Sequence, residues 1–390
     1  MSFDTKAVLN STVRDIPPSG IRKFFDIAAE MEDTISLGVG EPDFVTPWHI
    51  RDEGIYSLEK GHTHYTSNAG LKELRVQISK YLNRRFDLNY DPASQVIVTV
   101  GGSEAIDMFL RSVIEPGDEV LIPEPCFVCY KPLTELAGGT AIPLTTKAEH
   151  NFKLTADELK AAITPKTKVL VLPYPNNPTG AIMTKEDLEE IAEVILKTNI
   201  MVLSDEIYAE LTYGRRHISI ASIDGMYERT MLVSGFSKAY AMTGWRLGYA
   251  CGHPDIIAAM TKVHQYAIMS APTTAQYAAI EALKNGDSDI DAMCNEYNQR
   301  RVIMVNGFRN MGLDCFEPEG AFYVFPSIQS TGLSSADFCE KLLYGKRVAV
   351  IPGTAFGNCG EGFIRCSYAY SLDNINEALN RIEAFLKGNK

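Results

Sequence analysis

Residues 230–251 read TMLVSGFSKAYAMTGWRLGYAC: an apolar run, a lysine among small residues, and a second apolar run. Short apolar runs bounded by small or turn-forming residues are typical of strands covered on both faces, so 230–233 and 247–251 predict buried strands. Lys238 therefore follows the carboxyl end of a strand, where parallel sheets bind their ligands. In such a cleft its amine can bond to a carbonyl carbon, and the Arg246 guanidinium can hold a dianion. A solvated lysine and arginine in a surface loop fit the same spacing.

Apolar runs of the same kind recur through the middle of the chain, with helical patterns between several of them. This alternation predicts an α/β fold with a largely parallel sheet covered by helices on two sides. The runs are 96–100, 119–122, 168–172 and 200–203, and the helical patterns are 103–113, 184–196 and 254–266.

The two ends of the chain show a different pattern. A long helix over 287–310, hairpin-like strands at 321–325 and 363–368, and a closing helix from Leu372 predict a smaller α+β domain. We expect the first 45 residues, which contain Pro17, Pro18 and a short helix from Gly20, to pack with that domain. The predicted division is a large domain over 46–285 and a small domain formed by 1–45 and 286–390.

Composition excludes several classes of protein. The 390 residues include 37 basic and 49 acidic ones, so the net charge of −12 disfavours nucleic acid and membrane surfaces as partners. The first residues lack the apolar core of a signal peptide, and no 18 apolar residues run together. We therefore expect a cytoplasmic protein whose eight cysteines are thiols.

Further motifs surround the lysine stretch in a fixed order along the chain. Together with Ser237-Lys238 and Gly244-Trp-Arg246, they resemble the motifs of class I pyridoxal phosphate (PLP)-dependent aminotransferases of fold type I, the aspartate aminotransferase superfamily. The resemblance implies a mostly parallel seven-stranded sheet sandwiched by helices, PLP as cofactor, and a homodimer. The further motifs are Gly40-Glu-Pro-Asp43, Tyr65 in Tyr-Thr-Ser-Asn-Ala-Gly, Gly101-Gly-Ser103, Asn176-Asn-Pro-Thr-Gly180, Ser204-Asp-Glu-Ile-Tyr208 and Phe363-Ile-Arg365.

The turn that contains Gly101 joins a predicted strand to a helix, whose N-terminal amides suit a phosphate; a plain connecting turn is the alternative. By resemblance, the amides of Gly102, Ser103 and Glu104 hold the PLP phosphate, with Arg246 opposite. Ser237 adds a contact in this family. A second serine often stands where this chain has Gly235, so whether Ser234 replaces it stays open.

Asp205 follows a predicted strand, where a helix N-cap is the usual role of an aspartate. By resemblance it meets the pyridine nitrogen of PLP and keeps that nitrogen protonated. Tyr208 and Asn177 are expected to bond the cofactor phenolate oxygen, although Asn-Pro-Thr-Gly alone reads as a turn. Phe127 matches the aromatic that stacks on the pyridine ring, and a core phenylalanine is the alternative.

Substrate contacts follow from the same resemblance. Arg365 should grip the substrate α-carboxylate bidentately, with Gly40 and Asn177 nearby; an edge-strand arginine in solvent is the alternative. Tyr65 should reach the phosphate in the neighbouring subunit, which implies active sites at a dimer interface.

The activity implied is transfer of an amino group from an L-amino acid to a 2-oxo acid, with 2-oxoglutarate as acceptor. The kinetics should be ping-pong through pyridoxamine phosphate, with Lys238 as general base and acid and with Asp205 and Tyr208 as further catalytic residues. A β-lyase or PLP synthase of the same superfamily is one alternative. A non-enzymatic regulator that senses PLP or an amino acid is another, disfavoured by the acidic chain and by motifs that begin near residue 38.

The amino donor stays open among aspartate, aromatic amino acids and acetyl-diaminopimelate, which the most similar bacterial subgroup uses. Ile21, Arg22 and Lys23 are candidates for side-chain recognition. Cys126 and Cys129 form a Cys-x-x-Cys pair without a second pair, and His62 and His64 lack acidic partners, so no metal site is predicted.

Overall fold

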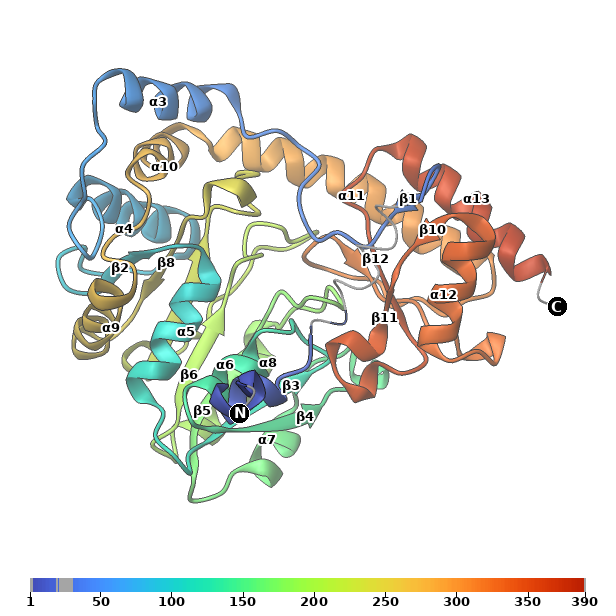
Figure 1. Cartoon of the computed structure of the whole chain (residues 1–390), viewed down its shortest axis with the longest axis horizontal. Coiled ribbons are helices and arrows are strands. Elements are labelled where there is room, and N and C mark those ends of the chain that lie inside the picture. The colour runs from blue at the N-terminus through green and yellow to red at the C-terminus, as the bar shows by residue number, and fades with distance from the viewer. Residues whose placement is uncertain (1–2, 19, 21–30, 389–390) are drawn as a thin grey trace.

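The computed structural model describes residues 3–18, 20 and 31–388 and is built around one seven-stranded sheet (Figure 1). The strand order is β2-β8-β7-β6-β5-β3-β4, and only β8 runs antiparallel to its neighbours. The predicted α/β class with a mostly parallel sheet is therefore confirmed. The strands are β2 (Val96–Thr99), β3 (Glu119–Glu124), β4 (Thr140–Thr145), β5 (Thr167–Leu172), β6 (Met201–Asp205), β7 (Thr230–Gly235) and β8 (Gly248–Cys251).

Six of these strands coincide with the apolar runs, and β4 was not among them. Its sequence TAIPLT is mostly exposed or half-buried because β4 lies at the edge of the sheet. An edge strand also accommodates a proline such as Pro143, because its open side needs no N–H for a neighbouring strand. The pattern of a strand buried on both faces therefore does not apply to it.

Helices cover both faces of the sheet, as expected. Alternate strand residues such as Ile97, Val169 and Val233 pack with α5 (Gly102–Val113), α6 (Tyr130–Leu136) and α9 (Pro254–Ala267). The opposite face packs with α7 (Ala156–Ala162), α8 (Lys185–Ile195), α4 (Lys72–Phe86) and α10 (Thr273–Asn285), and α3 (Trp48–Glu59) lies on α10.

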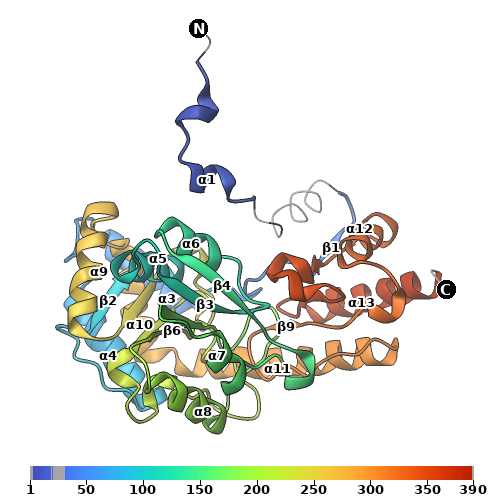
Figure 2. The ribbon, with the colours of Figure 1, turned by 90° about the horizontal axis from the view of Figure 1, so that it is seen from below.

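The last hundred residues form a second body beside the sheet, linked to it by α11 (Asp287–Asn310) (Figures 1 and 2). The predicted strand pair exists, since β9 (Tyr323–Val324) and β12 (Ile364–Ser367) are antiparallel and β11 (Ile351–Pro352) extends them. The remaining elements are α12 (Ser335–Lys346), β10 (Val348–Ala349) and α13 (Leu372–Gly388). Short 3-10 helices lie at Ala148–His150, Ile220–Ser222, Tyr227–Arg229, Thr243–Trp245, Gln329–Thr331, Gly353–Phe356 and Asn358–Gly360.

The N-terminal region divides between the two bodies. The strand β1 (Ile35–Ser36) pairs with β10 of the second body, as expected. The 3-10 helix η1 (Thr5–Val8) and α1 (Ser11–Asp15) extend away from the molecule and bury no residue, and α1 contacts α6 of the large body instead (Figure 2). The helix expected from Gly20 onward lies outside the described residues, and the domain boundaries stay a prediction.

Residues 37–46 cross between the two bodies and carry the motif around Gly40. The Leu37 backbone bonds to Ala349 and Ser367 in the second body, and the Thr46 hydroxyl donates to the Ala241 carbonyl in the large one. This crossing places the motif at the carboxyl ends of the central strands. None of the helices among the described residues is long and apolar enough to cross a membrane.

Asp43 fixes this crossing segment to α11 through an ion pair. Its two carboxylate oxygens accept from Arg300 Nη1 at 2.8 and 2.9 Å, and the Arg300 side chain is only 7% exposed. Asp43→Ala should lower the free energy of unfolding by about 2 kcal/mol, because it leaves a buried guanidinium without its main partner. Urea denaturation at fixed protein concentration measures this change.

Asp15→Ala is the matched control, since Asp15 pairs with Arg14 on the surface and both side chains are at least 48% exposed. Equal unfolding curves for Asp43→Ala and Asp15→Ala would contradict a fixing role for Asp43.

Candidate active site

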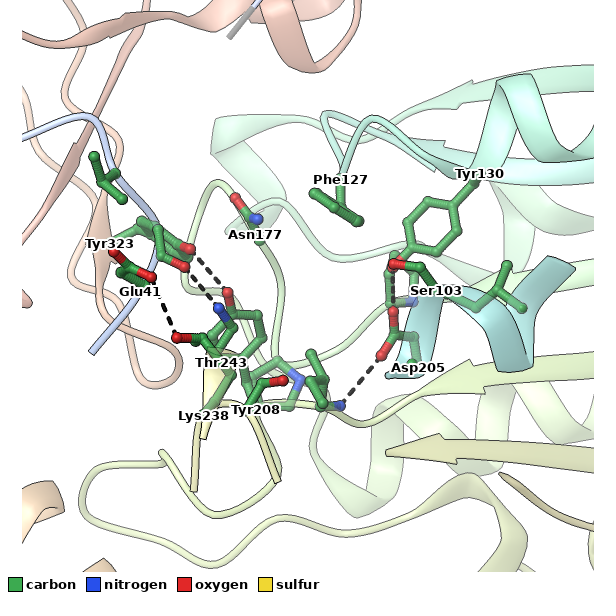
Figure 3. A pocket seen from close by; sticks show the side chains of 18 of the residues that line it. Glu41, Ser103, Phe127, Tyr130, Asn177, Asp205, Tyr208, Lys238, Thr243 and Tyr323 are labelled. Carbon is green, nitrogen blue, oxygen red and sulfur yellow. Dashed lines mark hydrogen bonds between the residues drawn. The ribbon is translucent and has the colours of Figure 1, made fainter. Parts of the chain in front are cut away.

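A cavity of about 400 Å³ lies at the carboxyl ends of the central strands, facing the second body (Figure 3). Its lining combines residues from the sheet, from the crossing segment and from β9 and β12. It brings together most of the residues singled out in the sequence: Gly40, Gly102, Ser103, Phe127, Asn177, Asp205, Tyr208, Ser237, Lys238, Arg246 and Arg365.

The side chain of Lys238 enters this cavity from the loop after β7. Its amine donates a hydrogen bond to the Gly40 carbonyl at 2.6 Å. Burial lowers the pKa of the amine from 10.5 to about 8, helped by the positive charges of Arg365 and Arg246 and opposed by Glu41. Lys238 is therefore a buried amine whose neutral, nucleophilic form is accessible near neutral pH.

Asp205 ends β6 and turns its carboxylate into the cavity (Figure 3). One oxygen accepts from the Tyr130 hydroxyl at 2.7 Å and the other from the Ile207 amide at 3.2 Å. Burial raises the pKa of Asp205 to about 6. The hydrogen bonds from Tyr130 and Ile207 act in the opposite direction, because they favour the ionised carboxylate. A cation brought next to this carboxylate would be held strongly, because little water competes.

Tyr208 and Tyr323 share a hydrogen bond in the floor of the cavity. Their hydroxyl oxygens are 2.8 Å apart, and burial raises the pKa of both groups. Gly40 packs on the Tyr323 hydroxyl so closely that a Cβ there would lie 2.3 Å from it. A glycine is therefore required at position 40 for this approach.

Arg365 lies on β12, 2% exposed, with its guanidinium in the cavity. Its Nη1 donates to Asn177 Oδ1 at 2.9 Å and its Nη2 donates to the Gly38 carbonyl, while Nε is buried without a partner. The guanidinium also lies over the rings of Tyr323 and Phe356, at 4.5 and 4.7 Å. Arg365 is therefore not an edge-strand arginine in solvent. Its unpartnered Nε is a donor that a carboxylate could accept from.

Gly102 and Ser103, at the start of α5, line another part of the cavity. Gly101 has φ +76°, and a Cβ there would lie 2.8 Å from Arg246 Nη2. A Cβ at Gly248 would lie 2.6 and 2.7 Å from the backbone of Gly101 and Gly102. The absence of side chains thus brings a helix N-terminus and a guanidinium close together, as a phosphate site requires.

Ser234 and Ser237, the two serines near Lys238, have different surroundings. Ser237 lines the cavity, whereas the Ser234 hydroxyl donates to the Glu206 carbonyl at 3.2 Å and does not line it. Gly235 packs against β8, where a Cβ would lie 2.9 Å from Gly248 Cα. A serine at position 235 would disturb this contact, so Ser237 is the hydroxyl available to an anion.

Phe127 lines the same cavity, with Tyr130 edge-on to it at a ring-centroid distance of 6.2 Å. Its neighbours Cys126 and Cys129 are free, and burial raises the pKa of both thiols well above the usual range. Buried thiols of this kind are poor nucleophiles. No group of His, Cys, Asp or Glu side chains among the described residues is suited to a metal ion.

Two site residues from the sequence are not among the residues that line the cavity. The Glu104 carboxylate accepts from the Val100 amide and lies 2.9 Å from His264 Nδ1, and a phosphate contact of the Glu104 amide stays a prediction. Tyr65 is 79% exposed and does not line the cavity of its own chain. The candidates Ile21, Arg22 and Lys23 lie outside the described residues.

Sequence reasoning missed four polar residues that line the cavity: Glu41, Tyr130, Thr243 and Tyr323. Glu41 and Thr243 stand inside recognised motifs and share a hydrogen bond of 3.2 Å. Tyr130 begins α6 three residues after Phe127, and this closeness in the sequence is a usable signal for a shared site. Tyr323 lies in a short strand without polar neighbours, and the sequence holds no comparable signal for it.

Comparison with known proteins places this geometry in a family. Residues 32–382 match the family described as aminotransferase class I and II. The chain belongs to this family. A putative aminotransferase (YugH) of Bacillus subtilis is 55% identical, over 97% of this chain and 98% of its own length.

Other class I and II aminotransferases support the same assignment. An aspartate aminotransferase of Pyrococcus abyssi is 46% identical, over 96% of this chain and 97% of its own. The crystal structure of an aromatic aminotransferase from Pyrococcus horikoshii superposes with a TM-score of 0.90 at 44% identity, covering 94% of this chain and 99% of that one. The resemblance drawn from the motifs is confirmed, and this aminotransferase is an enzyme of the transaminase type.

The acidity of Lys238 can be measured without any ligand. Only the neutral amine attacks an arylating reagent, so labelling by trinitrobenzenesulfonate should rise with a midpoint near pH 8. Mass spectrometry of the peptide containing Lys238 reports the extent of labelling, with the 62% exposed Lys185 as reference for the reagent. A midpoint near 10.5 for Lys238 would contradict its burial.

Proposed function

We propose that this aminotransferase binds PLP in the cavity and moves an amino group from an L-amino acid to 2-oxoglutarate in a ping-pong reaction. The observation that carries the proposal is the convergence of one buried amine, one buried carboxylate and two guanidinium groups on a single cavity. Class I aminotransferases use PLP, and their substrates are small amino and oxo acids.

The residues present fit this cofactor and an amino acid together. The glycines around α5 open a space beside Arg246 for a phosphate dianion, and Ser103 and Ser237 line it. Arg365 also lines the cavity, and its buried Nε has no hydrogen-bond acceptor. A carboxylate there would satisfy a buried donor that otherwise costs stability.

Each part of the cofactor then has a partner in the chain. We assign the phosphate to the amides of Gly102, Ser103 and Glu104 with Ser237 and Arg246, and the ring nitrogen to Asp205. Phe127 would cover the ring, Asn177 and Tyr208 would face the phenolate oxygen, and the amine of Lys238 would condense with the aldehyde carbon, whose oxygen leaves as water. When bound, PLP supplies a ring that accepts the electrons released as the Cα–H bond breaks.

The chain's own groups carry the proton transfers and the orientation. Arg365 grips the α-carboxylate as a fork of two donors, with Gly40 and Asn177 beside it, which fixes the direction of the Cα–H bond. Lys238 Nζ, once the substrate amine has replaced it on the aldehyde carbon, would take the Cα proton and deliver it to that carbon, and its pKa of about 8 suits a group that must both accept and donate. Asp205 stays ionised beside a cationic ring nitrogen, because that charge favours the carboxylate.

A homodimer completes the proposal, with Tyr65 reaching the phosphate of the neighbouring subunit. The support is the exposure of Tyr65 and of large apolar side chains on and near α3, a surface that an isolated chain would leave in water. These side chains are Val45, Trp48, Ile55, Tyr56 and Leu58. The cytoplasmic location stays a prediction.

Lys238→Ala tests the role of the amine. The variant should lose transamination and the absorbance band of the bound cofactor, because no second lysine of the described residues lines the cavity. The assay mixes enzyme, PLP, 2-oxoglutarate and single amino donors, including aspartate and phenylalanine, and measures glutamate. Lys185→Ala, on an exposed helix face, is the control and should keep both signals. Formation of pyruvate and ammonia in place of glutamate would indicate a β-lyase.

Asp205→Ala tests the carboxylate at the ring nitrogen. The loss should reach about a thousandfold in kcat/KM, equivalent to about 4 kcal/mol, since the ring then accepts electrons poorly. Asp118→Ala, which removes a partner of Lys168 and an acceptor of the Glu115 amide without touching the cavity lining, is the matched control. A rate for Asp205→Ala within about tenfold of the parent, roughly 1.4 kcal/mol, would place the partner of the ring nitrogen elsewhere.

A further inference from the structure

A buried polar cluster lies directly behind Asp205, on the face of the sheet that points away from the cavity. It consists of Ser204, Glu206, His217 and Ser219, called here the Glu206 cluster. Successive residues of a strand point to opposite faces, so Asp205 lines the cavity while Ser204 and Glu206 do not. Two members of the cluster, Ser204 and Glu206, are therefore the chain neighbours of Asp205, whose carboxylate we assign to the ring nitrogen.

The Glu206 carboxylate is fully engaged, although the residue is only 2% exposed. One oxygen accepts from the hydroxyls of Ser204 at 2.8 Å and Ser219 at 2.6 Å. The other lies 2.8 Å from Nε2 of His217, whose side chain is 7% exposed. A buried carboxylate is costly unless several donors face it, and here three do.

The backbone of Glu206 ties the two central strands together where they leave the sheet. Its amide donates to the Val233 carbonyl at 2.8 Å, and its carbonyl accepts from the Ser234 hydroxyl at 3.2 Å. Strand β6 leads into Asp205, and β7 leads into Lys238. Fixing Glu206 therefore fixes the separation of the two groups on which the proposed reaction depends.

The charge of Glu206 also acts on the cavity. Among the described ion pairs, Glu206 has no lysine or arginine partner and pairs only with the His217 ring. The other titratable groups that its charge reaches are Tyr90, Tyr249 and Cys251. The titratable groups around Asp205 are Tyr130 and Cys129 from the α6 side, Lys238 from the loop after β7, Tyr208 three residues further along the chain, and Glu206 from behind. The negative charge of Glu206 disfavours ionisation of Asp205, and by the same Coulomb interaction it favours a cation beside Asp205.

We propose that Glu206 is a positioning residue for Asp205. Glu206 ties β6 to β7, and it supplies a second fixed negative charge that keeps a ring nitrogen facing Asp205 protonated. The inference rests on the proposed function, because it assumes that the PLP ring nitrogen meets Asp205. A purely structural role, in which the cluster only attaches residues 217–219 to the sheet, would require the hydrogen bonds of Glu206 but not its charge.

Glu206→Gln separates these two roles. Glutamine has the same shape, its carbonyl oxygen can accept from both serines, and its amide can donate to the other tautomer of His217. The charge alone is lost. In the holoenzyme loaded with PLP that carries ¹⁵N in the ring, the ¹⁵N chemical shift followed against pH reports protonation of that nitrogen directly, independently of turnover.

We expect Glu206→Gln to lower the pKa of the ring nitrogen by about one pH unit, a tenfold change in its protonation equilibrium. Removing a nearby negative charge destabilises the cation, so deprotonation moves to lower pH. Glu206→Asp, which keeps the charge, should restore the parent midpoint. An unchanged midpoint in Glu206→Gln would overturn the proposal.

Glu210→Gln is the matched control, because Glu210 is also buried, with a side chain 6% exposed, and pairs with Arg85 away from the cavity. Equal shifts in Glu206→Gln and Glu210→Gln would overturn the proposal, since a general loss of packing would then explain both. Should Glu206→Gln fail to fold, His217→Leu replaces it, because losing the ring donor favours the neutral form of the carboxylate. The midpoint should move in the same direction, and an unmoved midpoint would again overturn the proposal. A parent enzyme that binds no PLP would instead refute the proposed function, and the inference with it.

Discussion

The hydrogen bond from the Lys238 amine to the Gly40 carbonyl joins two residues that lie 198 positions apart in the sequence. It exists because residues 37–46 cross from the second body to the carboxyl ends of the central strands. The same crossing brings the Gly38 carbonyl to Arg365 and Gly40 against the Tyr323 hydroxyl. The Lys238 amine, the Arg365 guanidinium and the Tyr323 hydroxyl therefore all contact this one short segment.

The charges in the cavity follow from the same architecture. Parallel strands place their carboxyl ends at one edge, so Asp205 after β6 and Lys238 after β7 meet there. Burial favours the neutral form of each group. It lowers the pKa of the Lys238 amine to about 8 and raises the pKa of the Asp205 carboxyl to about 6. The guanidinium groups of Arg246 and Arg365 both line the cavity, which suits ligands that carry two separate anionic groups. The site is thus arranged for an amine reaction between two bound anions.

The sequence predicts most of the strands and many of the cavity residues. The same physical reasons explain why it does not predict the others. Strands buried on both faces leave continuous apolar runs, which is why β2, β3 and β5–β8 were predicted while the half-exposed edge strand β4 was not. Cavity residues inside motifs, such as Asn177, could be carried over one by one. Tyr130 bonds to Asp205 across 75 positions, and Tyr323 meets Tyr208 across 115. Such contacts depend on how helices and strands pack, and residue spacing along the chain does not encode them. The choice between Ser234 and Ser237 likewise needed the contact with Glu206.

Reductive trapping tests the central claim most directly. Borohydride fixes an aldehyde covalently on whichever amine holds it, so the chain is incubated with PLP, reduced, digested and mapped by mass spectrometry. The account predicts the cofactor mass on the peptide that contains Lys238 and on no other lysine peptide at stoichiometric yield. Label spread over surface lysines, or concentrated on a lysine outside the cavity, would contradict it.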